Sequence, residues 1–197
     1  MKEIKIDYIA KIYGHASLDI KIKGNVIEPR LNIFESSRYF EDMVRGKRYD
    51  EVFHLCSRIC GICSPSHNIT SIMAVENALG IEVSEQTKML RDLLVLGGHI
   101  QSHSLHAYFL ALPDYLGYPG ILEMAREHKN VVERAFRMKA AGNRICEIVS
   151  GRSIHPLTTD VGGFHRIPEG KELQLSLIHI SEPTRPLYIS YAVFCLK

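Results

Sequence analysis

The sequence lacks the features that mark several classes of protein. Its net charge is only +2 over 197 residues, which argues against a polybasic nucleic-acid binder. Hydrophobic residues make up 46% of the chain, too many for a disordered one. It contains no apolar run long enough to span a bilayer, no internal repeat and no low-complexity segment. The length is enough for one ordinary globular domain, which needs no disulfides or structural metal ions to fold.

The sequence also lacks a signal peptide and an even set of cysteines. Met1 leads directly into a charged segment, and three of the five cysteines fall between Cys56 and Cys63. Clustered thiols without a secretory signal are typical of metal or redox chemistry in a reducing compartment rather than of a disulfide framework. We therefore expect a cytoplasmic protein with a metal or redox role.

Hydrophobic spacing predicts an α+β fold that is mainly α. Apolar residues alternate from Leu18 to Ile22 and again from Val26 to Ile33, with Gly24-Asn25 between them, which indicates a β-hairpin. Long packed helices should follow this N-terminal hairpin region. The expected helices are a short one capped by Ser36 or Ser37 and ending at Gly46, one from Ser64-Pro65 to Gly80, one from Ser84 to just before Pro113, and one from Pro119-Gly120 to Gly151.

The last part of the chain differs in character from the rest. Residues 152–170 are rich in Gly, Pro and His, and we expect an irregular loop too polar for a buried strand. The apolar stretch from Leu187 to Leu196 has the pattern of a terminal strand. The segment from Ser176 to Lys197, however, resembles a conceptual translation of sequencing-library adapter. We therefore divide the chain into residues 1–173 and a non-native tail, 174–197, and reads across the native locus should leave this sequence near Leu173 to Leu175.

Three thiols and an imidazole lie within twelve positions, at Cys56, Cys60, Cys63 and His67. Gly61 lets the backbone turn tightly, so Cys60 and Cys63 can converge on one ion. The helix expected to begin near Pro65 places its positive end beside them, which favours the ligating thiolate. Soft sulfur ligands favour zinc, copper(I), iron–sulfur centres or nickel over hard ions.

Two interpretations of this cluster follow from spacing alone. Cys56, Cys60, Cys63 and His67 could close a structural zinc site in a small interaction domain, although the usual second Cys-x-x-Cys pair is missing. The spacing of the three cysteines also matches the cluster motif of radical S-adenosylmethionine proteins. That family usually has an aromatic residue where this chain has Ile62, and strand–helix repeats where this chain has long helices.

A third interpretation comes from resemblance. The run from Arg58 to His67 resembles the Arg-x-Cys-Gly-x-Cys-x-x-x-His signature of the nickel–iron hydrogenase large, or alpha, subunit. The run from Ser102 to His106, with Leu112-Pro113-Asp114 after it, resembles the long-helix segment of that family's cytoplasmic, cofactor-coupled branch. Further elements similar to that family occur in the same order along roughly residues 2–172. They are Gly14-His15, Arg38-Tyr39-Phe40-Glu41, Ser102-His103-Ser104-Leu105-His106 with Leu112-Pro113-Asp114, Arg152-Ser153-Ile154-His155-Pro156 and Val161-Gly162-Gly163.

The resemblance implies a ligand set. Cys60 would be a terminal nickel ligand, and Cys63 would bridge nickel to an iron that carries cyanide and carbonyl ligands. Arg58 and His67 would lie beside these ligands, with His67 donating a hydrogen bond to the bridging sulfur. Glu41 would hold a magnesium-type ion, Mg or Fe, away from the nickel.

The resemblance also implies partners and a reaction. His155, with Arg152 beside it, would face an iron–sulfur cluster in a small subunit. The implied reaction is the reversible heterolytic oxidation of dihydrogen. Electrons would leave through that small subunit, and could pass onward to a nicotinamide- or deazaflavin-linked diaphorase subunit.

Two departures from the family pattern stand out. Tyr13 replaces the glutamate that normally precedes Gly-His and passes protons from the nickel thiolate, and a phenol is a poorer relay at neutral pH. The second cysteine motif, which supplies two further nickel ligands, is absent, since Cys146 and Cys195 stand alone. We therefore expect an N-terminal part of a longer subunit that is inactive by itself.

Three histidines share one face of the helix expected after Ser84. His99, His103 and His106 have the spacing of a metal-binding pair, but we expect them to pack against neighbouring helices or a partner and assign none as a ligand.

Overall fold

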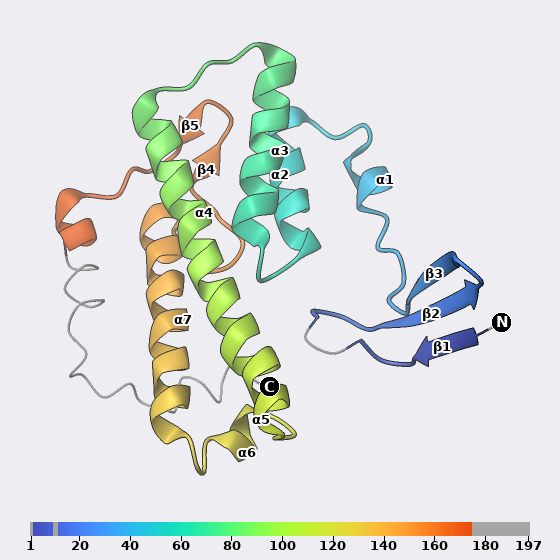
Figure 1. The fold of residues 1–197 in the computed structure, drawn as a ribbon. Helices are drawn as coiled ribbons and strands as arrows, with labels where there is room; N and C mark the ends of the chain where they lie inside the picture. The colour runs from blue at the N-terminus through green and yellow to red at the C-terminus, as the bar shows by residue number, and fades with distance from the viewer. Residues whose placement is uncertain (1, 10–11, 175–197) are drawn as a thin grey trace.

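A computed structural model describes residues 2–9 and 12–174 of the chain (Figure 1). The predictions for a terminal strand and for an adapter-derived tail lie outside these residues. Within them the chain forms an N-terminal antiparallel sheet followed by a helical body, which confirms the predicted fold class.

The sheet has the strand order β1-β2-β3. Strands β2 (Ala16–Lys23) and β3 (Val26–Ile33) form the predicted hairpin, and Gly24 in the turn has a φ of 60°. Strand β1 (Lys2–Ile6) pairs with β2 and was not predicted, because its five residues include only two apolar ones. The sheet stands beside the helical body rather than inside it (Figure 1).

The helical body contains two long helices, α4 and α7, and several shorter elements. In chain order these are α1 (Phe40–Val44), α2 (Tyr49–Cys56), the 3₁₀ turn η1 (Ser57–Ile59), α3 (Ser64–Leu79), α4 (Glu85–Leu105), the π-helical segment η2 (His106–Ala111), α5 (Leu112–Leu116), α6 (Ile121–Met124) and α7 (Lys129–Ser150).

Helix ends follow the predicted signals in part. The Ser84 hydroxyl accepts a hydrogen bond from the Thr87 N–H at 3.2 Å, and Gly80 and Gly151 end α3 and α7 in the left-handed conformation. The short helix before Gly46 is present as α1, but its predicted cap was wrong, because Tyr39, a non-glycine residue with a φ of 54°, takes the place of Ser36 or Ser37. Cys63 rather than Ser64 caps α3.

The two long helices differ from their predicted bounds. The helical path does not stop before Pro113, since η2 leads into α5 and proline is tolerated in a first turn, where its missing N–H has no partner to lose. The predicted helix from 119 to 151 is divided into α6 and α7, because His128 leaves the helical region with a φ of −119°.

The core lies where α2, α3, α4 and α7 meet. Its buried members are Phe53, Ile69, Ile72, Leu94, Cys146 and Val149. Helices α4 and α7 cross at glycines: a Cβ on Gly142 would lie 2.6 Å from the Gln101 nitrogen and 2.8 Å from the Gly97 oxygen.

The loop after α7 carries two short paired strands, β4 (Thr159–Asp160) and β5 (Gly163–Phe164). The expectation of a wholly irregular segment was wrong here, because Thr159 is fully buried and its hydroxyl donates to the Asn68 side-chain oxygen at 2.7 Å. A polar residue can occupy this buried position because its hydrogen bond is satisfied.

Candidate metal centre

Cys60 and Cys63 lie on the short loop that joins η1 to α3. Cys60 has extended backbone, and Cys63 caps α3 with a φ of −100° and a ψ of 19°. The Cys63 N–H donates to the Cys60 sulfur at 3.3 Å, and the two thiols are close enough to shift each other's pKa. The loop therefore brings the two predicted ligands into direct contact.

The surroundings give the two thiols different acidities. Burial alone would raise the pKa of Cys60, but hydrogen bonds from Cys63 and from the Ile62 backbone, with the charge of Arg38, lower it overall. Burial and the neighbouring Cys60 sulfur raise the pKa of Cys63 to about 11. Cys60 is thus the thiol that ionises first.

Arg38 holds the loop from outside. Its guanidinium donates to the carbonyl oxygens of Ile59 at 3.1 Å and Arg58 at 3.2 Å, directly before Cys60. It also lies over the Phe40 ring at 4.7 Å from the ring centre. Sequence reasoning gave Arg38 no role of its own, although it belongs to one of the quoted elements.

Tyr13 reaches the same region from the segment between β1 and β2. Its hydroxyl donates to the Ser102 carbonyl on α4 at 3.0 Å, and its ring meets the His106 ring edge-on at the start of η2. Burial, opposed by the Ser102 hydrogen bond and supported by Cys60 and Cys63, raises the pKa of the phenol. The hydroxyl therefore remains protonated beside the thiols at neutral pH.

The loop after α7 closes over the other side of the cysteine loop. The His155 N–H donates to the Ser64 hydroxyl at 2.9 Å, and its Nδ1 lies 2.9 Å from the Ser57 carbonyl oxygen. A carbonyl cannot donate, so Nδ1 carries the proton. Burial, followed by the charges of Arg58 and Arg152, lowers the pKa of His155 and keeps the ring neutral. His155 is also strained, with a φ of 56°.

The other predicted site residues make fewer contacts with the two thiols and their loop. His67 is half-buried in the first turn of α3, where its N–H donates to the Cys63 carbonyl at 3.2 Å. Glu41 is exposed on α1, and Arg58 and Arg152 are exposed as well. Among the described residues no group of three or more Cys, His, Asp or Glu side chains is placed to hold a metal ion.

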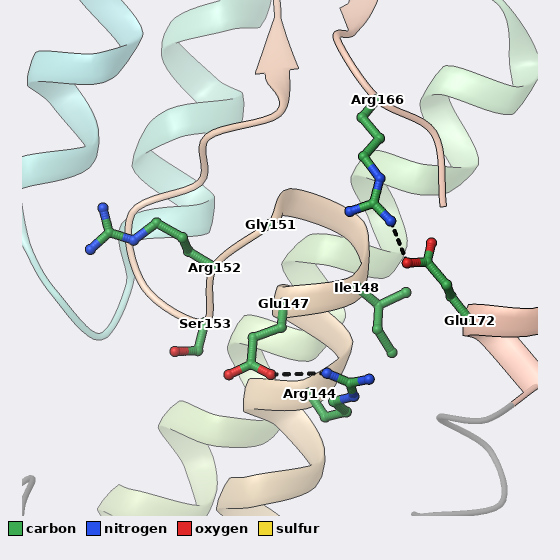
Figure 2. A pocket seen from close by; sticks show the side chains of 8 residues that line it. All are labelled: Arg144, Glu147, Ile148, Gly151, Arg152, Ser153, Arg166 and Glu172. Carbon is green, nitrogen blue, oxygen red and sulfur yellow. Dashed lines mark hydrogen bonds and ion pairs between the residues drawn. The ribbon is translucent and has the colours of Figure 1, made fainter. Parts of the chain in front are cut away.

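A cavity of about 410 Å³ lies near the end of α7 (Figure 2). Arg144 pairs with Glu147 at 3.3 Å and Arg166 pairs with Glu172, whereas the Arg152 side chain points away from these pairs. No cysteine lines this cavity, so the thiol chemistry lies elsewhere.

The donor chemistry of the loop fits part of a nickel centre. Two sulfurs in contact, one of them with a lowered pKa, form a donor pair of the kind that soft and borderline metal ions take. The described residues provide this pair and no complete ligand set.

Comparisons with known proteins agree with this geometry. A family model described as nickel-dependent hydrogenase matches residues 38–139, just over half of the chain. The alpha subunit of sulfhydrogenase 2 from Pyrococcus furiosus is 41% identical over 172 residues, which cover 87% of this chain and 42% of that protein. The alpha subunit of sulfhydrogenase 1 from the same organism is 39% identical, with 87% of this chain and 40% of that protein covered.

A solved structure of an NAD⁺-reducing [NiFe]-hydrogenase in the H2-reduced state has a similar fold. It superposes with a TM-score of 0.78 at 27% identity, and the match covers 90% of this chain and 42% of that one. The chain thus spans about two fifths of the length of these relatives. The family match disfavours both the zinc-domain and the radical S-adenosylmethionine interpretations. This chain belongs to the nickel-dependent hydrogenase family, as a counterpart of part of its large subunit.

Proposed function

We propose that this chain is the N-terminal part of a nickel–iron hydrogenase large subunit that takes part in the reversible oxidation of dihydrogen. The observation that carries the proposal is the contact between Cys60 and Cys63, which places two thiol ligands together inside the segment that matches the family. In this proposal residues 1–173 are the native part and residues 174–197 the non-native tail.

Cys60 and Cys63 would hold the nickel, Cys60 at a terminal position and Cys63 as the bridge to an iron with cyanide and carbonyl ligands. When bound, such a centre supplies a Lewis-acidic site that polarises dihydrogen for heterolytic cleavage. Cys60, whose pKa is lowered, is the thiol that ionises more readily and so offers its sulfur to the metal first. Arg38 fixes the loop by its two bonds to the backbone before Cys60.

Tyr13 would hold the neighbouring backbone in position rather than relay protons. Its hydroxyl holds its proton on the Ser102 carbonyl, and its raised pKa makes it a poor proton donor to solvent at neutral pH. Proton transfer away from Cys60 then requires another group. Tyr13 would also keep the segment before β2 against α4, on the side of the thiols.

The remaining assignments extend the proposal outward. Arg58 and His67 would lie beside the thiol ligands, and Glu41 would bind Mg or Fe. His155 and Arg152 would face the iron–sulfur cluster of a small subunit. With its proton on Nδ1, a neutral His155 presents an unprotonated Nε2, so it would donate to a cluster sulfide only after protonation.

The partners would be an iron–sulfur small subunit with, beyond it, a nicotinamide- or deazaflavin-linked diaphorase in the cytoplasm. None of the helices among the described residues is both long and apolar enough to cross a membrane. Because the described residues offer one thiol pair and no further ligand, we expect the 197-residue chain to show no turnover by itself.

The test is metal analysis of the longer protein, made by extending this chain through its native downstream sequence and produced anaerobically with its small subunit. We expect about one nickel per large subunit, retained in Cys56→Ser and lost in Cys60→Ser and Cys63→Ser. Hydrogen-dependent dye reduction should follow the nickel content. Stoichiometric zinc in place of nickel, or nickel retained in both Cys60→Ser and Cys63→Ser, would overturn the proposal.

A further inference from the structure

His99 and His103 lie one helical turn apart on α4, the long helix labelled in Figure 1. Both are exposed, so neither packs against a neighbouring helix among the described residues, and the expected contact with a partner stays a prediction. Their rings are nearly parallel, with an interplanar angle of 15° and ring centres 5.7 Å apart. Two imidazoles are thus presented side by side to solvent.

This arrangement is close to what one metal ion requires. Histidines four residues apart on a helix have neighbouring Cβ atoms and can reach a common point above the helix surface. An ion about 2.0–2.1 Å from one nitrogen of each ring places the ring centres roughly 5 Å apart at a cis angle. In the structure the ring centres are 5.7 Å apart and the rings are nearly parallel, so binding one ion requires both exposed side chains to rotate until their nitrogens point to a common centre.

The pair also lies next to the thiol loop. A Cβ on Gly98 would lie 3.2 Å from the Pro65 side chain at the start of α3, and the Ser102 carbonyl accepts from Tyr13. His99 and His103 each follow one of these contact residues along α4, so the pair lies one residue beyond the positions where α4 meets Pro65 and Tyr13.

We propose that His99 and His103 together bind one divalent transition cation, with Ni²⁺ as the expected ion and water completing its coordination. Imidazole is a good ligand for nickel, copper and zinc and a poor one for magnesium or calcium. The site itself depends only on the two rings. The preference for Ni²⁺ in the cell rests on the proposed function, since nickel is the metal that the adjacent thiols would need.

The experiment removes the competing thiols first. The full chain carrying Cys56→Ser, Cys60→Ser and Cys63→Ser is titrated with NiCl₂ by calorimetry at pH 8 in a weakly coordinating buffer. We expect one site in this parent. Because these thiols are absent, the result does not depend on the proposed nickel centre, and the histidine variants then identify which imidazoles bind the ion.

The variants are then compared in that parent background. His103→Gln should weaken Ni²⁺ binding about tenfold or more, because the second ligand no longer binds intramolecularly. His54→Gln removes an exposed single histidine on α2 and should leave the affinity unchanged. Far-UV circular dichroism checks the fold, and His99→Gln repeats the test should His103→Gln misfold.

A spectroscopic readout separates chelation from weak surface binding. Cu²⁺ bound to the parent should give an electron paramagnetic resonance spectrum with hyperfine coupling to two nitrogens, reduced to one in His103→Gln. The same Ni²⁺ affinity in the parent and in the double variant His99→Gln/His103→Gln would overturn the proposal. So would the absence of any Ni²⁺ site in the parent.

Discussion

At the scale of single residues, Cys60 and Cys146 show how surroundings decide what a thiol can do. Cys60 is partly exposed and its pKa is lowered by hydrogen bonds and by Arg38 against the effect of burial. Cys146 is fully buried between α4 and α7, where it donates to the Leu94 carbonyl at 3.7 Å. Burial raises its pKa to about 12, so it serves packing and not chemistry.

We expect iodoacetamide at pH 7.5 to label Cys60 well before Cys146 in the metal-free chain, because only the thiolate reacts and each pKa unit changes its population about tenfold. Arg38→Met should slow labelling of Cys60, since the variant removes a positive charge that stabilises the thiolate. Peptide mapping by mass spectrometry follows each site.

Arg45→Met, on an exposed arginine paired with Asp42, is the control and should leave the rate at Cys60 unchanged. Urea should expose Cys146 to labelling in every variant. Equal rates at Cys60 and Cys146 in the native chain would contradict this account of their surroundings.

At the scale of elements, local patterns predicted the parts of the fold that local interactions determine. The hairpin β2–β3, the capped start of α4 and the glycine ends of α3 and α7 follow from spacing within a few residues. The strand β1, the break before α7 and the segment η2 depend on what lies beside them in space, and these were missed. Their residues carry no periodic signal strong enough to predict them.

The candidate site divides in the same way. Cys60, Cys63 and His67 lie within one loop and one helical turn, so their spacing marks them as a candidate cluster, and their roles remain a prediction. Arg38 and Tyr13 reach the loop from distant segments through hydrogen bonds to backbone carbonyls, and any residue can supply a carbonyl. Such contacts leave no mark in the sequence.

Gly142 tests the crossing of α4 and α7. Alanine in a helix interior is normally more stable than glycine by up to about 1 kcal/mol. At Gly142 the added Cβ would meet backbone atoms of Gln101 and Gly97 within 3 Å, so Gly142→Ala should instead lower the free energy of unfolding by about 1–3 kcal/mol. Urea denaturation measures this change in the free energy of unfolding.

Ala140→Gly, on the exposed side of the same helix, calibrates the intrinsic propensity and should cost about 1 kcal/mol. A gain in stability from Gly142→Ala would mean that the two helices do not approach each other as closely as the structure has them.

The buried ion pair between Glu76 and Arg91 joins α3 to α4 and to the turn before β5. Arg91 bonds both carboxylate oxygens of Glu76 at 2.6 and 2.7 Å, and the Gly162 N–H donates to the same carboxylate. Both residues are at most 5% exposed. Glu76→Gln leaves a buried guanidinium without its counter-charge and should cost about 3–5 kcal/mol in unfolding free energy.

The same pair gives a pH dependence. Burial would raise the pKa of Glu76, but Arg91 and Gly162 lower it overall below its ordinary value of 4.5. The contribution is therefore complete above about pH 4.5 and is lost as the pH falls through the lower, folded-state pKa. Urea denaturation between pH 3 and 7 should show the free energy of unfolding falling toward low pH in the parent, and falling less in Glu76→Gln. The control is Glu85→Gln, which removes one partner of an exposed ion pair and should leave this pH dependence nearly unchanged.

At the scale of the whole molecule, one face of the N-terminal sheet is uncovered and apolar. The pairing register places Ile4 beside Ile20 and Leu18 beside Leu31, so their side chains share a face. On the third strand Ile27, Leu31 and Ile33 are between 58% and 67% exposed. A contiguous apolar face of this kind marks a surface that another chain segment covers. The chain spans about two fifths of its relatives, so a covering segment in the longer protein is a natural expectation.

We expect the 197-residue chain to self-associate through this face, because burying apolar surface between two copies of the chain removes it from water and is favourable. Sedimentation velocity should show an apparent mass that rises with concentration above the 22.3 kDa of the monomer. Ile27→Lys combined with Leu31→Lys places two charges on the face and should hold the chain closer to the monomer. Glu28→Gln, on the opposite and charged face of the same strand, should leave the association unchanged. If the parent remains a monomer at every concentration, the apolar face is too weakly exposed to drive association. That result would contradict the expectation that a segment of the longer protein covers this face.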